Sequence, residues 1–191
     1  MVKKKIRVLG IDDAPFSFSE SSTWLIGCLY RGVNVLEAVF RKDIEVDGQD
    51  STDKIVEMVE EAKQKDHIKA VVLDGITFGG FNTADIKEIK REIGNTVIAV
   101  NRDRPDFRTI ERAAGERDNG DEIMEAVESA GKVFEKELEQ GRIYFQYAGA
   151  DREEVESILD NFTEESSIPE PVRAAHLIAS GVKTGSSSGG R

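Results

Sequence analysis

The sequence predicts an α/β domain whose mixed sheet contains three antiparallel strands followed by parallel βα units, with helices on both faces. Two observations carry this prediction. The first third of the chain alternates apolar and polar stretches between turn signals, which is typical of an antiparallel strand meander. From residue 51 onward, helical periodicity alternates with short continuous apolar runs, which is typical of strands buried on both faces and joined by right-handed crossovers.

The antiparallel part is expected to consist of three consecutive strands. They read "KIRVLGID" (5–12), "TWLIGCLYR" (23–31) and "VLEAVFRKDIEV" (35–46). The loop "DAPFSFSESS" separates the first strand from the second, and "RGVN" supplies the turn before the third.

The parallel part is expected to alternate helices and strands. The helix 51–65 has apolar residues on one face and Ser51 or Thr52 as its N-cap. The elements that follow are a strand (69–74), a helix ended by Gly94 (83–94), a strand (96–101) and a helix with Pro105 in its first turn (104–115). Three antiparallel strands followed by helix, strand, helix and strand have the connectivity of the ribonuclease H-like fold.

The C-terminal part is expected to begin with one long helix over residues 119–141, which tolerates Gly131 in its interior at some cost. A strand (142–149) and a helix (151–162) come next. The last helix is expected to open at Pro169 and Pro171 and to close at Gly181. We therefore expect one domain over residues 1–182 and a disordered Gly/Ser-rich tail over residues 183–191.

Composition excludes several classes of protein. The 26 basic and 37 acidic residues give a formal net charge of −11, which argues against a general electrostatic grip on nucleic acid but leaves room for a local basic face. Cys28 is the single cysteine, so no internal disulfide can form. The longest apolar run is far too short for a membrane span, and the N-terminus has no signal-type apolar core. We expect a soluble cytoplasmic protein.

Three acidic residues end predicted strands, and they are the strongest candidates for a functional site. Asp12 and Asp13 end the first strand, and Asp74 ends the strand 69–74. Ligands of open sheets bind beyond the carboxyl ends of strands, and Asp12 and Asp74 meet there if their strands are neighbours. Two adjacent carboxylates repel each other unless a cation lies between them, so the pair predicts a site for Mg²⁺ or Mn²⁺. Such an ion can polarise a phosphoryl oxygen and activate water. Each acid alone would be interpreted as a turn former.

A third metal ligand could come from the segment "EVDGQDSTDK". Asp47 and Asp50 both precede the helix 51–65, and Asp50 is favoured because it lies at the start of that helix. His176, in "PEPVRAAHLIASG", is either a half-buried polar residue among Ala and Leu or a general acid, general base or neighbour of the metal ligands.

Two segments are candidates for substrate binding. Arg102 and Arg104, in "NRDRPDF", could receive phosphates, although solvated loop charges are commoner. Phe78, Phe81 and Asn82, in "FGGFN", belong either to a glycine-permitted turn that packs its own rings or to a surface on which a base stacks.

Five segments of the chain form an ordered series that resembles archaeal proteins grouped as a domain of unknown function related to endonuclease V. The segments are "LGIDDAPF", "IEVDGQDST", "VVLDGITFGGFN", "VIAVNRDRP" and "IPEPVRAAHLIASG". The resemblance implies Mg²⁺-dependent phosphodiester hydrolysis in nucleic acid that contains a deaminated base. Carried over by position, it implies Asp12, Asp50 or Asp47, Asp74 and His176 as site residues. The chain has no counterpart of the Tyr-Ile-Pro-Gly segment of endonuclease V between residues 45 and 55. It also has "ITFGGFN" where that enzyme has His-Pro-Arg after the Asp-Gly.

Two functions from different classes follow. The first is a metal-dependent nuclease that acts on DNA or RNA. The second is a non-catalytic module that binds a nucleotide, a nucleic acid or a protein through "FGGFN" and the arginines of "NRDRPDF". A small-molecule phosphoesterase is a third possibility that would suit the acidic composition.

Overall fold

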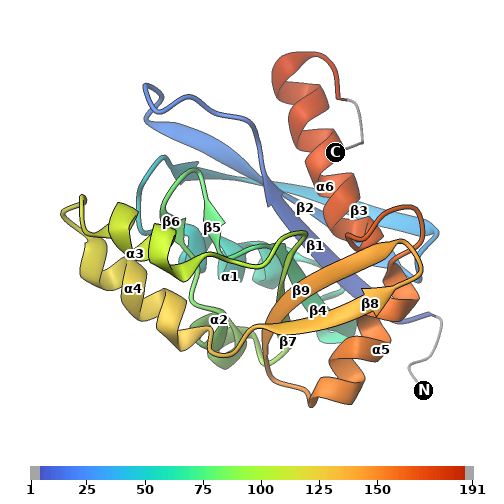
Figure 1. Cartoon of the computed structure of the whole chain (residues 1–191). Coiled ribbons are helices and arrows are strands. Elements are labelled where there is room, and N and C mark those ends of the chain that lie inside the picture. The colour runs from blue at the N-terminus through green and yellow to red at the C-terminus, as the bar shows by residue number, and fades with distance from the viewer. Residues whose placement is uncertain (1–4, 188–191) are drawn as a thin grey trace.

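The computed structural model describes residues 5–187 as a seven-stranded mixed sheet with helices on both faces (Figure 1). The strands of the sheet are β1 (Arg7–Asp13), β2 (Ser22–Arg31), β3 (Val35–Glu45), β4 (Ile68–Asp74), β7 (Thr96–Asn101), β8 (Phe134–Leu138) and β9 (Gly141–Ala148). A separate small hairpin consists of β5 (Thr77–Phe78) and β6 (Asn82–Thr83). The helices are α1 (Ser51–Glu61), the 3-10 helix η1 (Lys65–His67), α2 (Ile86–Ile93), α3 (Phe107–Ala114), α4 (Gly120–Ser129), α5 (Arg152–Phe162) and α6 (Glu170–Thr184).

The strand order confirms the predicted topology. The sheet runs β3-β2-β1-β4-β7-β9-β8, with β1, β4 and β7 mutually parallel and the remaining pairs antiparallel. The three-strand meander therefore forms one edge, and the parallel crossovers continue from its inner strand. Strands β1 and β4 are neighbours, as the metal-site hypothesis requires. The fold is the ribonuclease H-like α/β fold.

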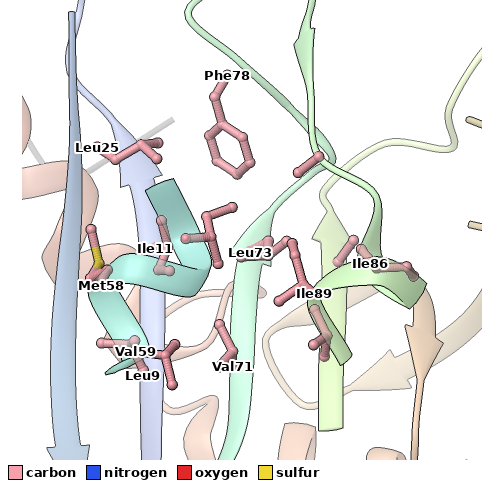
Figure 2. Close-up of a cluster of buried hydrophobic side chains, with 14 of the residues drawn as sticks. Leu9, Ile11, Leu25, Met58, Val59, Val71, Leu73, Phe78, Ile86 and Ile89 are labelled. Atoms are coloured by element: carbon pink, nitrogen blue, oxygen red, sulfur yellow. The ribbon is translucent and has the colours of Figure 1, made fainter. Parts of the chain in front are cut away.

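Alternation of side chains along β1 and β4 divides the core between the two faces of the sheet. Leu9 and Ile11 of β1 and Val71 and Leu73 of β4 pack with α1 and α2 in one buried cluster, where Figure 2 shows the Phe78 ring among them. The intervening residues of the same strands pack with α5 and the start of α6 in a second cluster. By the same alternation, Asp12 and Asp74 lie on the α6 face and Asp13 lies on the α1 face.

The expected long helix over residues 119–141 is wrong. Helix α4 ends at Ser129, and Gly131 takes a left-handed conformation with φ 75°, which a glycine adopts without steric cost. Residues 134–138 then form β8, the edge strand that pairs with β9. Phe134 and Leu138 pack on the second buried cluster while the two glutamates between them are exposed, so the period of this segment is that of a strand.

The end of α6 also differs from expectation. The helix continues through Gly181 to Thr184, and Gly185 is its left-handed C-cap with φ 83°. The first two residues of the expected disordered tail are therefore helical, and residues 188–191 lie outside the described residues. None of the helices within residues 5–187 has both the length and the apolar character needed to cross a membrane.

Candidate metal centre

Asp12 and Asp74 lie at the carboxyl ends of adjacent parallel strands. Ile11 pairs with Leu73 in the register of β1 and β4, so the two aspartates are the next residues along the two strands. Asp12 is 4% exposed, and each of its carboxylate oxygens has a partner. Its Oδ1 accepts a hydrogen bond from the backbone N–H of Asp13 at 2.8 Å, and its Oδ2 lies 2.8 Å from Nδ1 of His176.

Helix α6 carries His176 to this position because its first turn is pressed against β1. A Cβ atom on Gly10 would lie only 2.2 Å from the carbonyl carbon of Pro171, so the close approach requires glycine. The turn is held by Glu170, which is 6% exposed and accepts from Nε of Arg173 at 2.9 Å and from its Nη2 at 2.6 Å. The Pro-Glu-Pro segment therefore fixes the helix whose second turn presents His176 to Asp12.

Burial and neighbouring charges disfavour the charged forms of Asp74 and Asp13. Burial, followed by the charge of Asp12, raises the pKa of Asp74 from 3.8 to about 7, and His176 and Arg102 only partly oppose this. Burial also raises the pKa of Asp13 to about 6, against the hydrogen bond from Gly79 N–H. The hydrogen bond to Asp12 raises the pKa of His176, because it favours the imidazolium form.

The donor set fits a hard divalent cation. Two carboxylates lie side by side at the carboxyl ends of β1 and β4, and no hydrogen bond to the Asp74 carboxylate is found among residues 5–187. Within that same range, no group of three or more His, Cys, Asp or Glu side chains is arranged to hold an ion by itself. Mg²⁺ commonly retains several waters and binds through one or two carboxylates plus substrate phosphate oxygens, so a site with two carboxylates suits it. Asp12 and Asp74 would hold the ion.

Neither candidate for a third ligand is placed among these acids. The charged groups that act most strongly on Asp74 are Asp12, His176, Arg102 and Asp13. Asp50 instead accepts through Oδ1 from Nδ2 of Asn82 at 2.6 Å.

Asp47, at φ 55°, holds the loop between β5 and β6. Its Oδ1 accepts from the N–H of Phe81 at 2.9 Å, and its Oδ2 pairs with Nη1 of Arg117, also at 2.9 Å. Asp47 and Asp50 thus have structural partners on the α1 side of the sheet.

The expected substrate-binding residues differ in their exposure to solvent. Phe78 and Asn82 have no exposed surface, so the structure does not support a contact between either of them and a ligand. Phe78 fills the core, and Asn82 accepts from Ser51 N–H and donates to the Glu45 carbonyl and to Asp50. Phe81 is half-buried beneath the guanidinium of Arg117, whose Cζ lies 4.3 Å from the ring centroid.

The two arginines after β7 are exposed, and they differ in their relation to the acids. Arg102 directly follows Asn101, the last residue of β7, and its charge lowers the pKa of both Asp74 and His176. It therefore lies beside the acidic cluster. Arg104 is not among the groups that act most strongly on either residue.

Sequence reasoning missed the part played by Asp13. Its Oδ2 accepts from the N–H of Gly79 at 2.6 Å, which attaches the β5–β6 loop to the end of β1. The paired acids "DD" were visible, but strand alternation sends Asp13 to the face opposite Asp12, and only the fold reveals its partner. Arg117, in the segment between α3 and α4, gave no signal in the sequence.

The decisive comparison is with a family model described as endonuclease dU, which matches residues 4–183. The chain belongs to the endonuclease dU family. A curated relative is the UPF0215 protein of Methanothermobacter thermautotrophicus, which is 42% identical over 190 residues, with 98% of this chain and 93% of the relative covered. The expected kinship with an archaeal family related to endonuclease V is thereby confirmed.

Two solved structures have folds similar to that of this endonuclease dU family member. A protein of unknown function from Archaeoglobus fulgidus has a TM-score of 0.84 at 36% identity, covering 93% of this chain and 98% of its own. Endonuclease V of Ciona intestinalis, solved with a DNA that contains an inosine followed by a ribo-adenosine, has a TM-score of 0.57 at 11% identity. It covers 90% of this chain and 83% of its own. At that identity the likeness concerns the fold alone, and it confirms the endonuclease V-like scaffold.

Proposed function

We propose that this member of the endonuclease dU family is a divalent-metal-dependent endonuclease that hydrolyses phosphodiester bonds in nucleic acid. The observation that carries the proposal is the pair Asp12 and Asp74 at the ends of adjacent parallel strands. Burial and mutual repulsion raise the pKa of Asp74 to about 7, so the pair is poised to bind a cation that relieves the repulsion. Mg²⁺ or Mn²⁺ bound there would supply Lewis-acid polarisation of the scissile phosphate.

The residues of the chain have distinct parts in this proposal. Asp12 and Asp74 bind the cation, and His176 orients the Asp12 carboxylate through the 2.8 Å contact at Oδ2. Arg102 is exposed beside Asp74, where its guanidinium can bind a phosphate oxygen of the strand. Asp13 holds the β5–β6 loop at the rim of the site through Gly79.

The substrate class in this proposal is DNA with a deaminated base. The description of the matching family names dU, which is deaminated deoxycytidine, and the endonuclease V of similar fold was solved with inosine, which is deaminated adenosine. Both names support a deaminated base as the feature that the enzyme recognises, with deoxyuridine as the first candidate.

Cleavage of labelled oligonucleotides tests the proposal. Purified protein is incubated with Mg²⁺, Mn²⁺ or a chelator and with single-stranded and duplex DNA that carries one deoxyuridine, one inosine or no modified base. We expect cleavage near deoxyuridine that requires the metal and is lost in Asp74→Asn. Asp66→Asn is the matched control, because Asp66 is exposed in η1 before the amino end of the same strand, β4.

The outcomes separate the nuclease from a binding module. Metal-dependent cleavage that Asp74→Asn abolishes and Asp66→Asn retains supports the nuclease. Oligonucleotide binding that persists in chelator, with no cleavage in any metal, would instead support the non-catalytic module.

A further inference from the structure

The loop between β1 and β2 presents an exposed aromatic pair. The side chain of Phe18 is 69% exposed, the highest value among the exposed large hydrophobic residues of the described chain. Its ring packs edge-to-face against that of Phe16, with centroids 5.4 Å apart and an interplanar angle of 83°. Isolated apolar residues on a surface are ordinary, so the case for a function depends on how this pair is held and where it lies.

The Phe18 ring is held by an ordered turn. The carboxylate of Glu20 accepts from the N–H of Ser17 at 2.6 Å, and the N–H of Glu20 donates to the Ser17 carbonyl at 2.9 Å. Lys183 of α6 pairs with Glu20 at 3.0 Å, which ties the loop to that helix. A ring that is carried by an ordered turn and packs against a second ring loses less conformational freedom when a ligand stacks on it.

The aromatic pair lies in the loop beyond the carboxyl end of β1, the strand end that carries Asp12. Cε1 of Phe18 lies 3.2 Å from the position that a Cβ on Gly80 would take. The preceding residue, Gly79, donates its N–H to Asp13, the neighbour of Asp12. In Figure 1 the same loop, drawn in blue, projects beyond the carboxyl end of β1.

Two acids near the aromatic pair have cationic partners. Glu20 pairs with Lys183, and Asp47, whose Oδ1 lies close to Gly80, pairs with Arg117. Arg117 also covers the Phe81 ring. This aromatic rim (Phe16, Phe18, Gly80, Phe81 and Arg117) therefore combines three aromatic rings with paired charges, although the chain as a whole carries −11. A polyanion that approaches this rim meets two acids, Glu20 and Asp47, that are each paired with a cation.

We propose that Phe18, supported by Phe16, stacks on a nucleobase of the strand whose phosphate would contact the cation held by Asp12 and Asp74. The inference rests on the proposed nuclease function and adds the residue that grips a base beside the cleavage site. Every nucleobase offers a π-face, and an exposed aromatic ring beside a backbone-binding groove is the usual platform for an unpaired base. The substrate bound in this way is a single strand or a duplex whose base has left the stack.

The stacking inference is tested with a deoxyuridine oligonucleotide that carries 2-aminopurine next to the deoxyuridine. The wild type is compared with Phe18→Ala and Phe18→Trp. Stopped-flow fluorescence reports stacking before cleavage, and steady-state assays in Mn²⁺ give KM and kcat. We expect Phe18→Ala to raise KM roughly tenfold, to lose the 2-aminopurine signal and to keep kcat. Phe18→Trp should restore both. Leu36→Ala is the control, because it removes an exposed apolar side chain at the start of β3, the end of that strand remote from Asp12.

The outcomes distinguish the stacking inference from the nuclease proposal. If wild type cleaves and Phe18→Ala gives the same KM and the same 2-aminopurine signal, stacking by Phe18 is overturned while the nuclease stands. If wild type neither binds nor cleaves any oligonucleotide in Mn²⁺, the nuclease proposal fails and the stacking inference fails with it. Thermal unfolding of Phe18→Ala should match wild type, because the truncated ring is largely in solvent.

Discussion

Nδ1 of His176 lies 2.8 Å from Oδ2 of Asp12, so the last helix of the chain is joined to the end of its first strand at a buried carboxylate. The contact has two consequences. It fixes the orientation of the Asp12 carboxylate. It also brings the titratable His176 beside Asp74, whose pKa the imidazolium lowers against the effect of burial.

His176→Ala should weaken Mn²⁺ binding and cleavage by about 10- to 100-fold, because removing a group that orients a metal ligand has effects of this size. Calorimetric titration with Mn²⁺ measures the affinity, and His67→Ala, at the exposed η1, is the control. Unchanged Mn²⁺ affinity in His176→Ala would show that the contact has no orienting role.

The same contact should make the effect of His176→Ala on stability depend on pH. Asp12 raises the folded-state pKa of His176 above 6.5, so its stabilising contribution is complete below the unfolded pKa and is lost as the pH rises through the folded value. In chelator, the variant should therefore be destabilised more at pH 5.5 than at pH 9. Urea unfolding at the two pH values measures the difference, and an equal loss at both would contradict a charge-assisted bond.

Asp74→Asn should stabilise the metal-free protein at alkaline pH. The pKa of Asp74 is about 7 in the folded protein and 3.8 for an unperturbed aspartate, so the native state binds the extra proton and stability falls as the pH rises from about 4 to about 7. The asparagine removes this penalty, with a gain of at most about 4 kcal/mol at pH 8 that vanishes near pH 4. Mn²⁺ should reverse the order by stabilising only the wild type. Urea denaturation with chelator or Mn²⁺ measures both effects.

The architecture could be predicted because its signals are local. The continuous apolar runs of β4 and β7 require cover on both faces, and this fixes the parallel crossovers and the adjacency of Asp12 and Asp74. Strand β8 was missed because "FEKEL" contains good helix formers and follows a genuine helix. The left-handed Gly131 and the pairing with β9 decide its conformation, and the pairing is a tertiary contact.

Of the candidate site, the sequence predicts only which residues lie together at its centre. Asp12, Asp74 and His176 follow from strand ends and motif, whereas the partners of Asp47 and Asp50 depend on a loop that folds back from the end of β4. The side-chain amide of Asn82 donates a hydrogen bond to the Asp50 carboxylate at 2.6 Å, and no spacing in the sequence indicates this contact. Phe78 likewise belongs to the core and not to a surface, because the hairpin turns its ring inward.

Asp50→Ala should lower stability and leave metal affinity unchanged. Asp50 accepts from the buried Asn82 amide and from the N–H of the exposed Glu45, and removing it leaves the buried amide with one partner fewer at a cost of about 1–3 kcal/mol. Asp50→Asn retains an acceptor oxygen and removes the charge, so it should keep most of the stability. Calorimetry with Mn²⁺ gives the deciding measurement, because a loss of affinity in Asp50→Asn would make Asp50 a metal ligand.

Gly10→Ala should destabilise the fold and weaken metal binding together, although residue 10 is two positions from Asp12. Its Cβ would lie 2.2 Å from the Pro171 carbonyl carbon and 2.3 Å from the Val172 nitrogen, and backbone at that distance can only move away. Overpacking of this kind costs about 1–3 kcal/mol, and the retreat of α6 separates His176 from Asp12.

Gly181→Ala in the same helix is the matched control: a Cβ there meets nothing within 4 Å, and the change should stabilise by roughly 0.5–1 kcal/mol. Urea denaturation and Mn²⁺ calorimetry on both variants separate the two effects. If Gly10→Ala lost stability but kept wild-type Mn²⁺ affinity, the position of α6 would not control the metal centre.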